Sequence, residues 1–222
     1  YLLDVRHLWL RSRKMQAILK IRHTVFGAIH DYFRRRGFYE VHPPMFITAA
    51  VEGGATLFKV EYFDRTVYLT QSSQFYLEAL IYSLEKVYTI APSFRAEPSR
   101  TRRHLTEFWH AEMEMAWAHM EDAAKVGEEV ISYVVERVLD ERQEELKFLG
   151  RKVEALERAR PPFHWLSYDE AIEILKRKGF ALNWGDDIGA DEERALTLEF
   201  DKPIVLHGFP EKLKAFYHRN NP

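Results

Sequence analysis

The sequence predicts an α+β fold in which an antiparallel sheet is flanked by helices. Strand-like segments are separated by helical ones outside any regular β-α-β rhythm, which argues against a parallel sheet. Two long segments, 15–36 and 121–149, carry apolar residues at helical spacing. Between them, residues 91–117 have the pattern of two strands joined by a basic loop. With 222 residues, the chain can bury one good-sized core, or one core and a small insert.

The N-terminal part is predicted to form a helix followed by an extended segment. Gly37 stands where the helix over 15–36 needs a left-handed residue to end. The extended segment 38–46 contains Pro43 and Pro44, which have no N–H to donate to a neighbouring strand. We therefore expect an edge or interface strand here. The apolar helix positions are Ile18, Ile21, Val25, Ile29 and Phe33.

Shorter elements are predicted downstream. Ser167 and Glu170 form a capping-box pattern that opens a helix, and Gly179 follows its predicted end near Lys178. One face of the helix over 121–149 is expected to carry Val126, Val130, Val134 and Val138. The other predicted elements are a hairpin over 57–63 and 67–70 turned at Asp64-Arg65, a helix over 74–84, a strand over 87–90, a connector over 150–162 and paired strands over 204–209 and 213–217.

The second strand of the 91–117 hairpin separates two kinds of side chain. Because successive strand residues point to opposite faces, one face carries an apolar set, which we expect to pack on a core. The other face gathers groups that would be costly to bury against apolar atoms. The apolar set is Trp109, Ala111, Met113, Met115 and Trp117; the polar set is Phe108, His110, Glu112 and Glu114, joined by Ser93, Arg95 and Glu97 from the first strand.

A polar sheet face is most often simply solvated. Two features favour a ligand site instead. Phe108 lies on the polar face, where a solvated sheet has no use for a ring. The connecting loop is strongly basic, which suits phosphate, and its basic residues are Arg100, Arg102, Arg103 and His104. We predict the floor of a polar ligand site, and no metal site, because strand spacing is wide for three ligands of one ion.

Composition narrows the function classes. The net charge of −2 gives no global nucleic-acid signature, so any RNA contact must come from local basic patches. The absence of cysteine excludes disulfides, thiolate zinc sites and cysteine nucleophiles, and it fits an intracellular protein. No apolar run approaches the roughly 18 residues of a membrane span, so no membrane partner is expected.

The segment FRAE…RRHLTEFW resembles motif 2 of the class II aminoacyl-tRNA synthetases, in particular their aspartyl/asparaginyl subgroup. Four further stretches resemble the same subgroup: AVEGGATLF, LTQSSQFYLEA, WGDDIGADEE and KAFY. Residues 15–46 resemble motif 1, which builds the dimer interface in that family, and motif 2 covers about 91–117. The resemblance implies that 1–222 is a partial catalytic domain, incomplete at its C-terminal end, with a helical and connecting region over 121–200. Motif 3 and the anticodon-binding domain are not in this sequence.

Motif 2 binds ATP in this family. The resemblance implies that Arg95 binds the α-phosphate and the substrate carboxylate, and that Glu97 orients the adenine amino group. It implies that Phe108 stacks on adenine and that His104 lies near the γ-phosphate. The remaining implied contacts are Arg103 with ATP, and Arg100 and Arg102 with the acceptor end of tRNA, although the residues themselves do not separate phosphate from tRNA roles.

Two positions bear on the choice of amino acid. Aspartyl members of the family carry Lys where this chain has Leu77, and typically Asp where it has Glu112. Leu in place of Lys removes a cation, and Glu in place of Asp extends an anion. Both differences favour a carboxamide substrate over a carboxylate substrate. The resemblance also implies that Glu52 meets the α-ammonium group, and that Gln71 and Gln74 orient the amino acid.

The implied activity is ATP-dependent activation of asparagine as an adenylate and its transfer to tRNA(Asn), in a cytoplasmic homodimer formed through motif 1. The cofactor implied besides ATP is Mg²⁺, with its ligands expected mainly beyond this sequence. We expect this piece not to be competent by itself. Three alternatives stay open: a non-discriminating aspartyl enzyme, a tRNA-independent paralogue that makes asparagine, and a non-catalytic synthetase-like binding protein.

Overall fold

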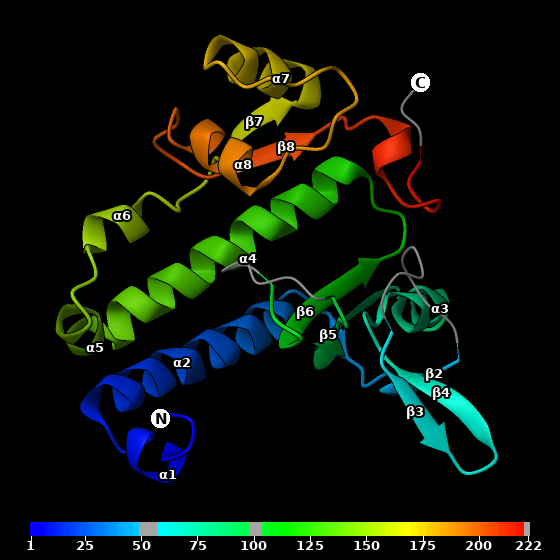
Figure 1. Cartoon of the computed structure of the whole chain (residues 1–222), viewed down its shortest axis with the longest axis vertical. Coiled ribbons are helices and arrows are strands. Elements are labelled where there is room, and N and C mark those ends of the chain that lie inside the picture. Colours follow the sequence, from blue (N-terminus) through cyan, green and yellow to red (C-terminus); the bar gives the residue numbers. More distant parts are fainter. Residues whose placement is uncertain (49–56, 98–103, 220–222) are drawn as a thin grey trace. The chain divides into compact units, whose positions relative to one another are not determined.

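The structure is a computed structural model that describes residues 1–48, 57–97 and 104–219 (Figure 1). The chain divides into two compact units, one of His30–Ala123 and one of Tyr1–Ile29 with Ala124–Pro222. Helices and mainly antiparallel strands confirm the predicted α+β class. Within the described ranges, no helix combines the length and the apolar character that a membrane span requires.

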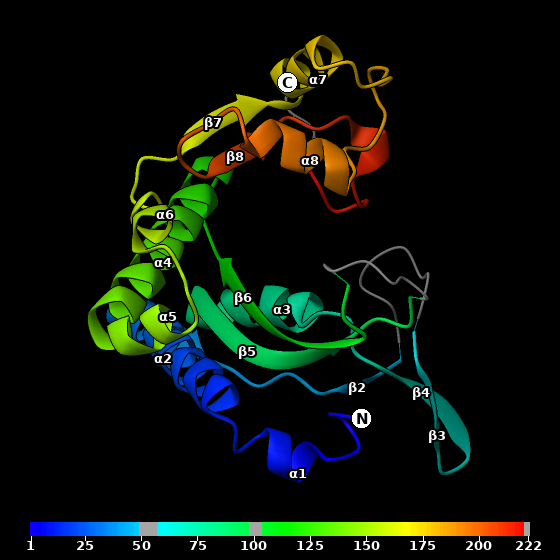
Figure 2. The ribbon, with the colours of Figure 1, turned by 60° about the vertical axis from the view of Figure 1, so that its left-hand side comes forward.

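The main sheet belongs to the unit His30–Ala123. Strands β5 (Lys86–Phe94) and β6 (Glu107–Met115) pair antiparallel along their whole length, as Figure 2 shows. The short strand β1 (Tyr39–Glu40) pairs parallel with the beginning of β5 and lies at the sheet edge. The predicted hairpin is therefore confirmed. The edge strand predicted over 38–46 is only partly right, because Tyr39–Glu40 alone lies at this sheet edge and Pro43 and Pro44 lie outside any strand. Strand β5 is longer than the predicted strand over 87–90, because its pairing with β6 continues to Phe94.

The two faces of β5–β6 have different neighbours within this unit. Helix α3 (Gln74–Leu84) contacts both strands, and its Leu77 is fully buried (Figure 2). On the opposite face, Phe33 of helix α2 (Arg13–Arg35) stacks on Tyr88 with ring centroids 4.8 Å apart. This face, which carries Trp109, was predicted to pack on a core, and the prediction holds only in part. Phe33 covers it beside Tyr88, whereas Trp109 is 51% exposed.

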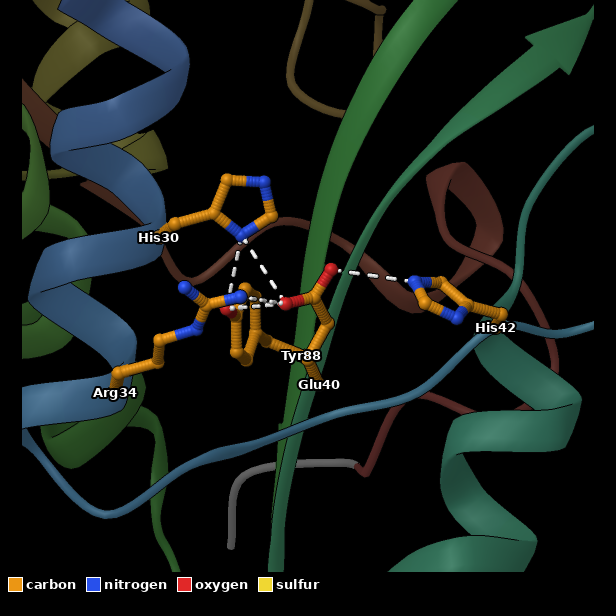
Figure 3. A network of polar contacts seen from close by, with 5 residues as sticks. All are labelled: His30, Arg34, Glu40, His42 and Tyr88. Atoms are coloured by element: carbon orange, nitrogen blue, oxygen red, sulfur yellow. Dashed lines mark hydrogen bonds and ion pairs between the residues drawn. The ribbon is translucent and has the colours of Figure 1, made fainter.

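A polar network ties β1 to α2 and β5 (Figure 3). Glu40 accepts hydrogen bonds from Arg34 at 2.5 Å and from the hydroxyl of Tyr88 at 3.1 Å. His30 lies 2.9 Å from the same hydroxyl, and His42 lies 3.2 Å from the other oxygen of Glu40. Burial and the nearby Glu40 raise the pKa of Tyr88 to about 12, so Tyr88 stays a neutral donor. The network explains why so short a strand is held at the sheet edge.

A second sheet in this unit has the order β2 (Phe46–Ile47), β4 (Arg65–Leu69), β3 (Lys59–Tyr62). The predicted hairpin is confirmed, but its turn lies one residue earlier than Asp64-Arg65. Tyr62 pairs with Arg65 across the strands, which leaves Phe63 and Asp64 as the turn residues. Phe63 has a φ of 55°, a conformation that side-chain propensity would not predict for an aromatic residue.

In the other unit, α2 lies alongside α4 (Met120–Glu141) in Figure 1. The predicted helix over 121–149 is divided, because Arg142 leaves helical geometry with φ −130° before α5 (Gln143–Phe148) begins. The four predicted valines all lie on α4, where Val138 is buried and the other three are half-buried, and two polar residues of α4 are buried as well. One of them, Glu128, accepts a hydrogen bond from Trp165 at 3.1 Å. The helices α1 (Arg6–Trp9) and α6 (Val153–Glu157) complete this part of the unit.

A small α/β layer follows in the same unit. Strand β7 (His164–Ser167) pairs parallel with β8 (Ile204–His207). The prediction of paired strands over 204–209 and 213–217 is therefore wrong: the partner of β8 lies 40 residues earlier, and Glu211–Leu213 is a 3₁₀ turn. The helices of this layer are α7 (Tyr168–Arg177) and α8 (Ala190–Thr197), and its core comprises Leu166, Tyr168, Ala171, Ile172, Leu175, Ile188 and Leu196.

Candidate functional site

The polar face of β5–β6 brings Ser93, Phe108, His110, Glu112 and Glu114 into one row, as predicted. The prediction that Arg95 and Glu97 lie on the first strand is wrong, because β5 ends at Phe94. Ser93 of β5 is almost fully buried and lies opposite Phe108 of β6. The hydroxyl of Ser93 lies 3.3 Å from Nδ1 of His110. The same nitrogen lies 3.5 Å from Oε1 of Glu112. His110 therefore links a buried hydroxyl to the carboxylate that we associate with amino-acid choice.

The Glu112 carboxylate is held at the N-terminus of α3. The Ser72 hydroxyl donates to its Oε1, and the backbone N–H of Ser73 donates to its Oε2 at 2.9 Å. The Glu112 side chain is only 11% exposed. A helix N-terminus presents unsatisfied N–H groups and a partial positive charge, so it stabilises an anion at this place. Each carboxylate oxygen keeps further acceptor capacity, so Glu112 can still accept from a ligand N–H.

A second carboxyl group lies two residues along the same face. Burial, and then the negative charges of Glu78 and Glu112, raise the pKa of Glu114 to about 7. Glu78 belongs to α3 and accepts a hydrogen bond from Nε2 of Gln74 at 2.8 Å. Two carboxyl groups from β6 and one from α3 therefore interact at the same end of the sheet. Near neutral pH, Glu114 is about half protonated.

The other end of the face carries the residues that the resemblance assigns to ATP. The guanidinium of Arg95 lies over the ring of Phe108, 5.5 Å from its centroid. The rings of Phe108 and His110 are 5.3 Å apart. His104 and Glu97 approach to 3.8 Å across the loop that joins β5 to β6. The described residues that are implied in ATP binding therefore form two close pairs. Arg95 lies over the ring of Phe108, and the imidazole of His104 lies beside the carboxylate of Glu97.

The remaining predicted residues fall into two groups. Gln71 is buried immediately before α3, and Leu77 has no exposed surface. Leu77 thus packs inside this unit and presents no surface to a ligand. Glu52, Arg100, Arg102 and Arg103 lie outside the described residues.

The sequence pattern did not single out several polar groups of this site. Ser72 and Ser73 were not predicted as site residues, because short polar residues before a helix usually cap that helix. Glu78 was not predicted as a site residue, because a single Glu on a helix is usually solvated. Thr89 lies opposite Glu112 in the β5–β6 register and is fully buried, and its hydroxyl has no hydrogen-bond partner among the described residues. Only pairing between distant segments reveals such groups.

Mg²⁺ is the metal that the resemblance implies. No three His, Asp or Glu side chains within residues 1–48, 57–97 and 104–219 are placed to hold a metal ion. The best-placed carboxylate, Glu112, is already held by two donors of the segment before α3. The described residues thus do not fit a Mg²⁺ site, and we derive no step through the ion.

Comparison with known proteins places this geometry in a family. The family model described as class II tRNA synthetases (D, K and N) matches residues 1–222. The chain belongs to this family. The asparagine–tRNA ligase of Pyrococcus abyssi is 54% identical over 221 residues, which cover 100% of this chain and 51% of that protein. The asparagine–tRNA ligase of Symbiobacterium thermophilum is 44% identical over 229 residues. The chain spans about half the length of the curated relatives it matches.

Solved class II synthetases confirm the fold of the chain. The asparaginyl-tRNA synthetase of Pyrococcus horikoshii, complexed with asparaginyl-adenylate, superposes with a TM-score of 0.97 at 53% identity. The superposition covers 100% of this chain and 51% of the Pyrococcus horikoshii chain. The aspartyl tRNA synthetase of Entamoeba histolytica superposes with a TM-score of 0.78 at 28% identity, covering 97% of this chain and 42% of its own. Both relatives share the class II synthetase fold with this chain.

Proposed function

We propose that the protein containing this chain activates asparagine with ATP and transfers it to tRNA(Asn). One observation carries the choice of amino acid: the carboxylate of Glu112 accepts hydrogen bonds from Ser72 and Ser73 on the floor of the site. A fixed carboxylate accepts N–H groups from a carboxamide and repels the carboxylate of aspartate. Leu77 supports the same preference, because it stands where aspartyl members of the family carry Lys.

The polar face supports binding of ATP at its other end. Arg95 is proposed to bind the α-phosphate and the substrate carboxylate, because a guanidinium can follow the charge that builds on phosphorus oxygens. Phe108 offers its ring to adenine, and Glu97 an acceptor to the adenine amino group. His104 and Arg103 are proposed to lie near the outer phosphates. Catalysis then consists mainly of alignment and charge stabilisation, with little proton transfer by the protein.

The remaining parts of the proposal concern partners. Glu52 is proposed to meet the α-ammonium, while Gln71 and Gln74 orient the amino acid. Arg100 and Arg102 are proposed to contact the acceptor end of tRNA. We also propose a cytoplasmic homodimer joined through residues 15–46, and Mg²⁺ as a cofactor whose ligands would come mainly from outside the described residues. The relatives named asparagine–tRNA ligase support asparagine and tRNA as substrates.

Pyrophosphate exchange tests the proposal directly. The complete gene product that contains this chain is assayed with ATP and either asparagine or aspartate. We expect asparagine to be preferred by at least ~100-fold in kcat/KM, in the range that buried polar groups achieve. Equal activation of aspartate would show a non-discriminating enzyme and refute the proposed choice. No exchange with either amino acid would refute the activity itself.

An Arg95→Lys variant tests the assignment of the ATP end. Lys keeps the charge but loses the planar fork with its two parallel donors. We expect exchange to fall at least ~30-fold, which corresponds to about 2 kcal/mol of transition-state stabilisation. The exposed Arg65 of β4 gives a matched control, and Arg65→Lys should leave the rate unchanged. Exchange by the Arg95 variant near the wild-type rate would remove Arg95 from the site.

A further inference from the structure

The side chain of Gln74 is oriented by one partner. Gln74 is the first residue of α3, and its backbone N–H donates to the Ser72 hydroxyl at 3.2 Å. Its side-chain Nε2 donates to Oε1 of Glu78, one helical turn further on, at 2.8 Å. Both side chains are half-buried. The pair therefore lies beside the donors that hold Glu112, in the part of the site that we associate with the amino acid.

The chemistry of this pair decides which end of the Gln74 amide is available. An ionised carboxylate can only accept hydrogen bonds, whereas an amide has a donor end and an acceptor end. Gln74 must therefore turn its NH₂ group toward Glu78, and its carbonyl oxygen points away from Glu78. A neutral amide at position 78 could accept or donate, so it would leave both orientations of Gln74 open. The carboxylate of Glu78 thus leaves the carbonyl oxygen of Gln74 available to accept a hydrogen bond from another neighbour.

The groups around Gln74 point to the same kind of ligand. Glu112 offers carboxylate oxygens from β6, and no Lys or Arg occurs on α3. We propose that Glu78 is a positioning residue, which holds Gln74 so that its carbonyl oxygen accepts an N–H of the bound amino acid. This inference rests on the proposed function, because asparagine supplies the N–H groups. Burial, with Glu78 and Glu112 beside it, raises the pKa of Glu114, which agrees with a local excess of acceptors.

The first test uses Glu78→Gln in the complete gene product. The replacement keeps the shape of the side chain but can accept or donate, so Gln74 loses its fixed orientation. We expect the KM for asparagine to rise about fivefold, the size of one ordinary hydrogen bond, with the KM for ATP unchanged. Glu61→Gln on β3 removes the same charge from an exposed strand position and should change neither KM. An unchanged KM for asparagine in the Glu78 variant would overturn the inference.

A double-mutant cycle separates positioning from a structural role. Gln74→Ala removes the group that Glu78 is proposed to orient. If Glu78 acts through Gln74, adding Glu78→Gln to this background should change the KM for asparagine by less than about 1.5-fold. If Glu78→Gln still raises the KM for asparagine about fivefold in the Gln74→Ala background, Glu78 acts by itself and the inference is overturned.

An exchanged pair keeps the test decisive even if single variants fold poorly. In Gln74→Glu/Glu78→Gln, the amide at 78 donates to the carboxylate at 74, and an oxygen still faces the ligand. We expect a KM for asparagine within about twofold of wild type, and a value as high as that of Glu78→Gln would contradict the inference. Wild-type exchange with asparagine distinguishes the two proposals: its absence refutes the proposed function, whereas its presence with an unaffected Glu78→Gln refutes only the role of Glu78.

Discussion

Helices α3 and α7 both begin at a glutamate carboxylate, but the two carboxylates come from different places. At α7, Ser167 donates its backbone N–H to Glu170 at 2.8 Å, and Glu170 returns its own N–H to the Ser167 hydroxyl. At α3, Ser73 donates its N–H to Glu112 at 2.9 Å. Glu112 belongs to β6, 39 residues further along the chain. One cap is made within a single helical turn, and the other needs the whole β5–β6 hairpin.

The same interaction caps a helix in one region, and in the other it involves the carboxylate that we propose for the ligand site. Glu170 caps the start of its own helix from an exposed position, and the hydrogen bonds from Ser167 lower the pKa of Glu170. Glu112 is nearly buried and also reaches His110 and the Ser72 hydroxyl. The backbone of Glu112 is fixed by the β5–β6 ladder, while its carboxylate is held by Ser72 and Ser73 at the start of α3.

The largest expected effect separates the two carboxylates by their consequence for activity. Glu112→Gln in the complete gene product replaces an anion by a neutral amide that both donates and accepts. We expect asparagine-dependent pyrophosphate exchange to fall at least ~30-fold, since hydrogen bonds to charged groups are worth about 1.5–3 kcal/mol. Glu170→Gln is the matched control at α7, and its exchange rate should equal that of wild type. Equal losses in the two variants would show that both glutamates act only on folding.

The contrast between the two helices also explains what the sequence could predict. The capping box at Ser167 was predicted because its members are three residues apart, and the helix over 74–84 was predicted to the residue. The polar row on β6 followed from alternation, which needs only one strand. The contacts of Ser73 with Glu112 could not be predicted, because nothing local indicates which strand lies against the first turn of α3.

The second prediction concerns Glu114, whose pKa is raised by burial, Glu78 and Glu112 from 4.5 to about 7. Such a group favours the folded state fully below pH 4.5, and that contribution is lost as the pH rises through 7. Glu114→Gln removes the titration. Allowing for solvent screening, we expect the free energy of unfolding of wild type to fall by about 1–2 kcal/mol relative to the variant between pH 5 and pH 8. Urea denaturation at the two pH values measures this, and parallel pH profiles would contradict it.

Partners distant in the sequence also account for the predictions that were wrong. The short apolar strand over 204–207 has no feature that distinguishes a following partner from β7, which lies across two helices. The alternation on β6 correctly separated two faces, but it could not show that Trp109 on the apolar face is half exposed. Alternation identifies which side chains share a face, and other segments decide what covers that face.

The smallest expected effect compares the serines at the two helix starts. The Ser167 side chain accepts the N–H of Glu170, so Ser167→Ala should lower the free energy of unfolding by about 1 kcal/mol. The Ser73 side chain makes no capping hydrogen bond, and its backbone N–H still reaches Glu112 after substitution. Ser73→Ala should therefore cost less than about 0.5 kcal/mol. Urea denaturation of the two variants side by side gives the comparison. A larger loss at Ser73 than at Ser167 would mean that α3 depends on its own serine, and that Glu112 is not the group that stabilises its first turn.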